Sequence, residues 1–266
     1  MPNYRNPAVA GMFYPSEENE LQQSIQALLD KVPEKKHEQP QAIIVPHAGY
    51  IYSGMTAAHA YKLLQSYRKT IKRVVVLGPS HHVALKGLAV PSCDSFMTPL
   101  GNIPLDVDEI VQLSEFPQII TSDMAHEHEH SLEVQLPFLQ TVLDEFKLIP
   151  IVVGQSSAAS TSMIIEKYLK EPTDLVVIST DLSHFLDYEH ALQKDRKTNQ
   201  NILKKQGEAL DFDDACGRMP VIGMLYAAVL HNLNVELLDL RNSGDTAGDK
   251  QRVVGYGAWS ISHVEH

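Results

Sequence analysis

The sequence lacks the long apolar runs and the cysteine patterns that mark membrane and secreted proteins. Its longest apolar runs are only as long as strands, and its first residues lack the basic and then apolar profile of a signal peptide. The two cysteines, Cys93 and Cys216, form neither a CxxC pair nor a disulfide framework. We therefore expect a cytoplasmic protein with no membrane partner.

Positive charge is also scarce. The chain has 22 lysines and arginines against 33 acidic residues, and the basic residues form no run. The formal net charge of -11 argues against a phosphate backbone as a ligand, because nucleic-acid-binding proteins usually carry a basic stripe. We expect no nucleic-acid partner.

Strand-like and helix-like patterns alternate along almost the whole chain. Short β-branched runs bounded by Gly, Pro and Ser, as at 42–45, 73–77 and 174–178, are typical of buried strands in a mostly parallel sheet. Apolar residues at helical spacing predict helices between them, for example over 17–32 and 187–205.

The expected architecture is α/β, with a mostly parallel or mixed central sheet flanked by helices. The chain has no Pro/Gly/Ser-rich linker and no internal repeat, so we expect a single domain over residues 1–266. A further helical pattern starts at Leu132 and contains Pro137, which predicts that the helix starts late or is kinked there.

Three of the predicted strands end at a histidine: His47, His81 (followed by His82) and His184. Ligands of parallel sheets collect beyond the carboxyl ends of the strands, so these imidazoles are expected to converge. Only one histidine of the adjacent pair is expected to point into a cleft, and we favour His81. The pattern predicts a metal or acid–base site.

Asp181 lies three residues before His184, and a helix beginning there would place both side chains on one face. A carboxylate beside an imidazole fixes its tautomer and raises its basicity, as a general acid/base requires. The alternative is a helix N-cap in which Asp181 or Ser183 binds backbone N–H groups.

The segment 125–134 is rich in possible ligands. His126, His128 and His130 would lie on one side of an extended chain, but an exposed polar loop before a helix has the same pattern. His130 and Glu133 are the exception, because both fit on a first helical turn that faces inward. This pair is expected to line the site.

Two further features offer little chemistry of their own. The loop 243–249 could supply an oxygen ligand through Asp245, but its two glycines without a following helix do not make a phosphate loop. Neither cysteine is next to a histidine in the sequence, and there is no Gly-x-Ser-x-Gly elbow, so nucleophilic catalysis is not favoured.

Six segments together resemble the Memo-like family over nearly the whole chain: 6–14 (NPAVAGMFY), 46–50 (PHAGY), 77–82 (LGPSHH), 129–133 (EHSLE), 179–184 (STDLSH) and 242–245 (NSGD). That family is similar in fold to the class III extradiol dioxygenases, whose non-haem iron cleaves catechol rings next to the diol. Its prokaryotic members are often grouped with a radical-SAM protein and an AMMECR-like protein, which are therefore expected partners.

The resemblance implies roles for individual residues. His47 and His81 match the two iron-binding histidines of the dioxygenases, and His184, with Asp181 beside it, matches their acid/base histidine. The dioxygenases complete the site with a late glutamate, and animal Memo proteins carry a cysteine in that region. Asp245 or Thr246 occupies the equivalent loop here, and Asp245 would restore a carboxylate.

The implied cofactor is iron, as Fe(2+), with Zn(2+) or Cu as alternatives, and the implied substrate is a small molecule. A non-catalytic protein that binds a peptide or partner in the same cleft is one alternative. A zinc-dependent hydrolase is the other, because two histidines and a carboxylate also suit zinc.

Overall fold

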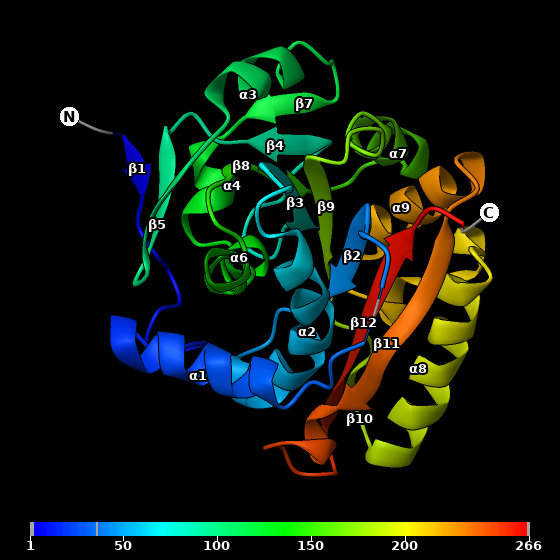
Figure 1. Cartoon of the computed structure of the whole chain (residues 1–266). Coiled ribbons are helices and arrows are strands. Elements are labelled where there is room, and N and C mark those ends of the chain that lie inside the picture. Colours follow the sequence, from blue (N-terminus) through cyan, green and yellow to red (C-terminus); the bar gives the residue numbers. More distant parts are fainter. Residues whose placement is uncertain (1–2, 36, 265–266) are drawn as a thin grey trace.

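A mixed β-sheet runs through the middle of the molecule in the computed structural model, which describes residues 3–35 and 37–264 (Figure 1). Its central strands are parallel and lie in the order β2 (Ala42–Val45), β9 (Asp174–Ser179), β3 (Arg73–Pro79) and β8 (Lys147–Val153). Almost every residue of these strands is buried, because helices cover both faces. The predicted α/β architecture with a mixed sheet is confirmed.

Antiparallel strands extend the sheet at both sides. Beyond β2 lies β12 (Val253–Ser262), which pairs with β11 (Asn234–Asn242) and β10 (His184–Leu186). Beyond β8 lie β4 (Leu88–Val90) and β7 (Ile119–Thr121). A separate small sheet contains β1 (Tyr4–Arg5), β5 (Ser95–Thr98) and β6 (Gly101–Pro104).

Helices lie on both sides of the large sheet (Figure 1). One side carries α2 (Tyr50–Leu64) and α6 (Leu136–Val142), with α1 (Glu18–Asp30) packed outside them through Leu21, Ile25 and Leu29. The other side carries α7 (Ala158–Glu166), α8 (Tyr188–Leu203) and α9 (Arg218–Leu230). Short helices α3 (Val107–Leu113), α4 (Asp123–Glu127) and α5 (His130–Glu133) lie in the connections.

Two local predictions are resolved by the structure. The helical pattern from Leu132 is divided into α5 and α6, and Pro137 is the second residue of α6, so the helix starts late. No helix begins at Asp181: residues 180–183 form a loop, and β10 begins at His184. The expected helical face shared by Asp181 and His184 is therefore wrong.

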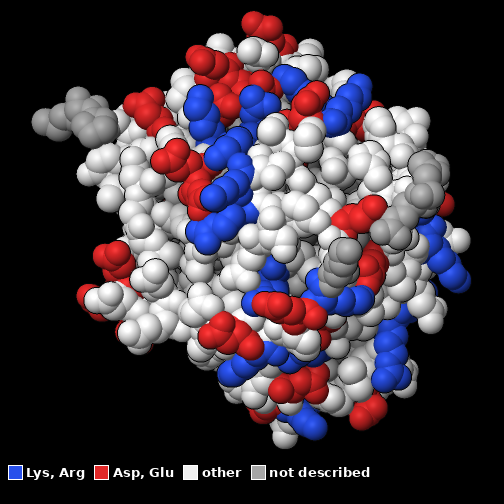
Figure 2. Space-filling view, in the orientation of Figure 1, with Lys and Arg blue, Asp and Glu red and all other residues white. Residues whose placement is uncertain are grey.

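Charged side chains of both signs are interspersed on the face shown in Figure 2, where most lysines and arginines lie beside acidic residues. Of the helices in the described part of the chain, none has the length and apolar character that crossing a bilayer requires.

Candidate metal centre

The strands that carry the predicted histidines are neighbours in the sheet. His47 follows β2, His81 follows β3, and the loop that leads to His184 follows β9, which lies between the other two. All three strands are parallel, so these segments leave the sheet at the same edge. The rings of His47 and His81 lie 5.2 Å apart between centroids.

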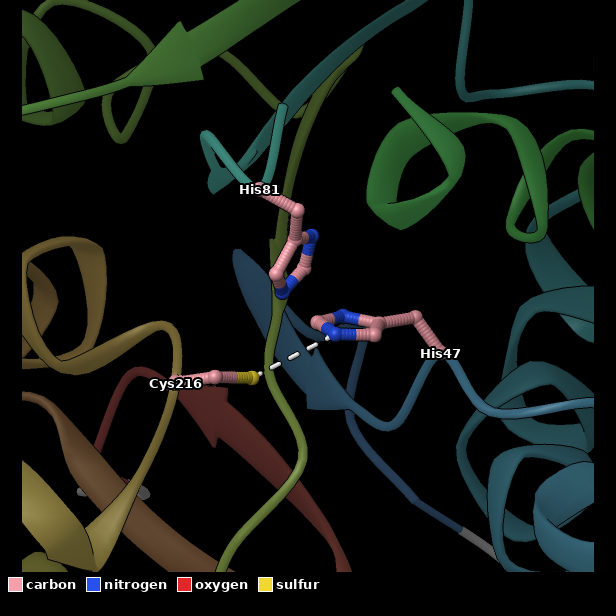
Figure 3. A group of neighbouring side chains, drawn as sticks. All are labelled: His47, His81 and Cys216. Atoms are coloured by element: carbon pink, nitrogen blue, oxygen red, sulfur yellow. Dashed lines mark hydrogen bonds between the residues drawn. The ribbon is translucent and has the colours of Figure 1, made fainter. Parts of the chain in front are cut away.

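A sulfur atom completes this group. One ligand atom each of His47, His81 and Cys216 lies within 4.8 Å of the other two. The Cys216 Sγ atom is 3.3 Å from His47 Nε2, and the three side chains point toward a common centre (Figure 3). Cys216 is not next to a histidine in the sequence, but the fold places it beside His47, so the expectation that the cysteines offer little chemistry is wrong for Cys216.

Close backbone packing brings Cys216 to the end of β9. A Cβ atom on the next residue, Gly217, would lie 2.5 Å from the carbonyl oxygen of Ser179, so only glycine allows this approach. The Gly217 N–H donates to Thr180 Oγ1, and the Asp181 N–H donates to Cys216 Sγ at 3.2 Å. A backbone N–H directed at the sulfur is a contact that stabilises a metal-bound thiolate.

The tautomer of His47 follows from the hydrogen bonds of Ser179. The Ser179 hydroxyl donates to the carbonyl of Ser131 at 2.6 Å and accepts from the Gln135 amide at 2.9 Å. A hydroxyl has one proton to donate, so its 2.8 Å contact with His47 Nδ1 requires that Nδ1 carries the hydrogen. The unprotonated Nε2 then faces Cys216 and is free to bind a metal.

His81 is oriented by a carboxylate. Glu129 accepts hydrogen bonds from His81 Nδ1 at 2.8 Å and from the His81 backbone N–H at 2.6 Å. Burial alone would raise the pKa of Glu129, but the hydrogen bonds and charge of His81 outweigh it and lower this pKa to about 2. Glu129 is thus an ionised partner that leaves His81 Nε2 free for a ligand.

Burial also favours the uncharged forms of the other groups. It lowers the pKa of His47 well below its usual value, with the neighbouring His81 as a second cause. It raises the pKa of the Cys216 thiol to about 12, with the nearby Asp181 carboxylate contributing. A neutral imidazole can bind a metal directly, whereas the thiol must lose its proton when an ion binds.

Asp181 acts on His47 more directly than on His184. Its Oδ1 atom accepts the backbone N–H of His47 at 2.8 Å, and its Oδ2 atom is 4.0 Å from His47 Nε2. Burial raises the pKa of Asp181, and the hydrogen bond from His47 partly opposes that rise. Asp181 therefore fixes the loop after β2 and adds a carboxylate to the edge of the centre.

A cavity of about 870 Å³ opens beside this group, and His81, Cys216 and His184 are all in its lining. This volume suits a small organic ligand. His184 therefore shares the cavity with His81 and Cys216, as an acid/base residue would. The adjacent Phe185 has a positive φ of 61°, at an irregularity in the pairing of β10 with β12.

Two predicted site residues, Glu133 and Asp245, make their hydrogen bonds elsewhere in the fold. Both oxygens of Glu133 are occupied, by Arg5, Tyr14 and the N–H groups of Ala8 and Val9. Asp245 caps a 3₁₀ turn over 243–245, and accepts from Tyr188 and from the Asn242 N–H. Neither belongs to a group of potential metal ligands in the described residues.

Thr246, the alternative to Asp245, is not among these ligands either. Its hydroxyl donates to the carbonyl of Ser243, and it lines a second cavity beside α1 and α2. The third position next to the two histidines is therefore filled by Cys216, from a loop more than 25 residues earlier in the chain.

The histidines of the segment 125–134 separate in the structure. His126 is buried in α4 and hydrogen-bonded to the carbonyl of Ala89, while His128 is exposed. His130 stacks on His81 with ring centroids 4.6 Å apart, and it forms a second group of potential ligands with His81 and Glu129. Of the predicted pair His130 and Glu133, only His130 contacts the centre.

Sequence reasoning missed Cys216 and Glu129. Cys216 is 169 residues from His47, and no local pattern connects them. The available signal is Cys216 followed by Gly217, directly before α9. The pattern of the segment 125–134 is also that of an exposed polar loop, so it does not single out Glu129, although Glu129 lies within the segment 129–133 that carries the family resemblance.

Comparison with known proteins gives a consistent result. A family model described as "Memo-like protein" matches residues 5–260. A MEMO1 family protein of Aquifex aeolicus (strain VF5) is 40% identical over 263 residues, covering 95% of this chain and 97% of the relative. MEMO1 family proteins of Sulfurisphaera tokodaii and Methanobrevibacter smithii are 36% and 34% identical, each covering at least 95% of this chain and 97% of the relative.

Proposed function

The chain belongs to the Memo-like protein family, and from this membership and the site we propose that it is a metal-dependent oxidoreductase. It binds one transition-metal ion through His47, His81 and Cys216, and it oxidises a small organic molecule held in the adjacent cavity. The observation that carries this proposal is the gathering of two imidazole nitrogens and one sulfur within 4.8 Å.

The residues fit a metal ion in both distance and chemistry. An ion about 2.1 Å from an imidazole nitrogen and about 2.3 Å from a thiolate holds these two atoms about 3–4 Å apart. The separation between His47 Nε2 and Cys216 Sγ is 3.3 Å. Ser179 and Glu129 hold the other ring nitrogens of the two histidines, as metal-bound histidines commonly require.

Iron(II) is the ion that we propose, because His47 and His81 match the iron-binding histidines of the extradiol dioxygenases. When bound, iron would supply open coordination positions and redox chemistry for a substrate and dioxygen. The thiolate of Cys216 distinguishes this donor set from two histidines and a carboxylate. Zinc and copper also accept imidazole and thiolate ligands. Metal analysis of the purified protein therefore decides among iron, zinc and copper.

The residues around the centre have defined parts in the proposed reaction. His184, in the lining of the cavity, moves protons to and from the bound molecule. Buried His47 stays neutral and keeps its lone pair directed at the centre. Apolar side chains such as Leu182 and Val153 form much of the wall and would pack against the apolar part of the bound molecule.

A cysteine–histidine nucleophile is the competing reading of the contact between Cys216 and His47. Such a nucleophile works as a thiolate, which requires a lowered thiol pKa. Burial and the Asp181 carboxylate instead raise the pKa of Cys216 to about 12. The thiol is therefore a poor nucleophile on its own, and the metal-binding proposal explains the contact better.

Anaerobic purification with metal analysis, followed by measurement of dioxygen consumption with catechols, tests the proposal. We expect about one equivalent of iron in the wild type and less than a tenth in His47→Ala and Cys216→Ser. Cys93→Ser is the matched control, because Cys93 is the other free cysteine and lies outside both groups of potential ligands in the described residues. Equal metal content in Cys216→Ser and Cys93→Ser would contradict the proposal, and zinc without dioxygen uptake would favour hydrolysis.

A further inference from the structure

The cavity beside the centre is largely apolar but contains a guanidinium with unused donors. Its walls include Val83, Leu85, Val153, Leu182, Phe212 and Met219. Two cations, Lys194 and Arg218, also line it. These two differ in how much of their charge is already paired.

Lys194 is engaged within the protein. Its Nζ atom lies 2.8 Å from Asp214 Oδ1, and this ion pair raises the pKa of the lysine. Two further acids, Asp211 and Asp213, also act on it. Lys194 therefore has little charge to offer a ligand.

Arg218 is held by one nitrogen and free at the others. Its Nε–H donates to the carbonyl of Leu210 at 2.7 Å, which fixes the plane of the guanidinium. Within residues 3–35 and 37–264, no carboxylate pairs with it, and its two terminal nitrogens donate to no other group. A half-buried guanidinium with two parallel donors available matches a carboxylate in bidentate geometry.

The position of Arg218 relative to the metal ligands is set by the chain. Arg218 is the first residue of α9 and follows Cys216 by two positions, so their Cα atoms are at most about 7 Å apart. Cys216 and Arg218 also line the same cavity, which would allow a molecule the size of a substituted benzene ring to contact both the metal and the guanidinium. The apolar side chains that line this cavity would pack against the ring.

We propose that the substrate of this centre is an organic acid with an apolar, ring-sized body, whose carboxylate is bound by Arg218. This inference rests on the proposed metal centre and adds the chemical class of its substrate. Asp213, the one acidic residue in the lining, is exposed on the 212–214 turn and would disfavour a second negative charge on the ligand. The expected substrate is a monocarboxylate.

The test compares acids with neutral molecules of the same shape. Anaerobic calorimetry on the iron-loaded protein would measure binding of 2,3- and 3,4-dihydroxybenzoate, each paired with its carboxamide. We expect at least one acid to bind ten or more times more tightly than its amide. In Arg218→Gln that preference should vanish, with metal content and amide affinity unchanged.

Arg252→Gln is the matched control, because Arg252 stacks on Phe185 outside the cavity lining and its loss changes the net charge equally. Arg252→Gln should prefer the acid over its carboxamide by the same factor as the wild type. Equal affinity for acid and amide, a preference that survives Arg218→Gln, or no binding of either molecule to the iron-loaded protein would overturn the inference. Failure of the wild type to hold a metal would instead overturn the proposed function.

Discussion

Two buried glutamates four residues apart, Glu129 and Glu133, have opposite roles in this protein. Glu129 accepts hydrogen bonds from His81 and orients a predicted metal ligand. Glu133 accepts from Arg5, Tyr14 and two backbone N–H groups, and it holds the N-terminal segment against the body of the protein. Glu129 therefore orients a residue of the site, whereas Glu133 stabilises the fold.

The difference shows that direction, not only spacing, assigns a residue to a site. Glu129 is the extended N-cap of α5, with φ −78° and ψ 116°, whereas Glu133 is the last residue of that single turn. The four-residue spacing would place both on one face only if both were helical. Because Glu129 precedes the helix, the two side chains leave the backbone in different directions.

Glu133→Gln is the strongest test of this division, and we expect it to lower the free energy of unfolding by about 3–5 kcal/mol. The change leaves the buried Arg5 guanidinium without its counter-charge, 2.6 Å from the replaced oxygen. Urea denaturation measures the loss, and metal analysis of the folded fraction should match the wild type. Stability equal to that of the wild type would show that Glu133 does not anchor the N-terminal segment.

Acid should remove the contribution of Glu129 in a defined pH range. Its pKa is about 2 in the folded protein and about 4.5 when unfolded, so ionised Glu129 stabilises the fold above the unfolded value. That stability, about 3 kcal/mol for a shift of this size, is lost as the pH falls from about 5 to 2. The difference in unfolding free energy between the metal-free wild type and Glu129→Gln should shrink over this range, and a constant difference would contradict the assignment.

Glu129→Gln should weaken metal binding by about 10–100-fold, because the amide is a poorer acceptor for the His81 Nδ1 proton. Competition against a coloured chelator measures the affinity. Glu127→Gln is the matched control, since Glu127 is two residues away and exposed. If both variants bind metal equally well, Glu129 does not affect the metal affinity of the site.

Tyr14→Phe should give the smallest effect, a loss of about 1–2 kcal/mol of unfolding free energy with unchanged metal affinity. The change removes one hydrogen bond, of 2.5 Å, to Glu133 and leaves the ring in place. Thermal and urea unfolding measure it. A change in metal affinity larger than the change in stability would show that the Glu133 side of the molecule also controls the site.

Much of the fold could be predicted from local patterns. The β-branched runs and helical spacings predict β2, β3 and β9 and the helices α1 and α8 to within a few residues, because burial imposes those patterns. The order β2-β9-β3 could not be read from them, since it depends on which crossovers pack together. The sequence nonetheless predicts the convergence of His47 and His81, because parallel strands share one edge. His184, which was expected to converge with them, lies in the lining of the adjacent cavity and outside the group of potential ligands in the described residues.

The residues of the site that were missed depend on contacts between distant segments. Cys216 reaches His47 only because Gly217 packs against the end of β9. Asp245 is a plausible carboxylate ligand and Glu133 a plausible residue of the site lining by type and position, but each is occupied by a capping or anchoring contact that the sequence does not reveal. Residue type and family resemblance identified the two histidines, and tertiary packing decided the third partner.

X-ray absorption spectroscopy of the anaerobically prepared, metal-bound protein tests the central claim most directly. Sulfur ligation of a protein-bound metal gives a scattering distance of about 2.3 Å, separate from imidazole nitrogens at about 2.1 Å. We predict one sulfur and at least two imidazoles in the wild type, and loss of the sulfur signal in Cys216→Ser but not in Cys93→Ser. A bound metal with only nitrogen and oxygen neighbours in the wild type would contradict the account.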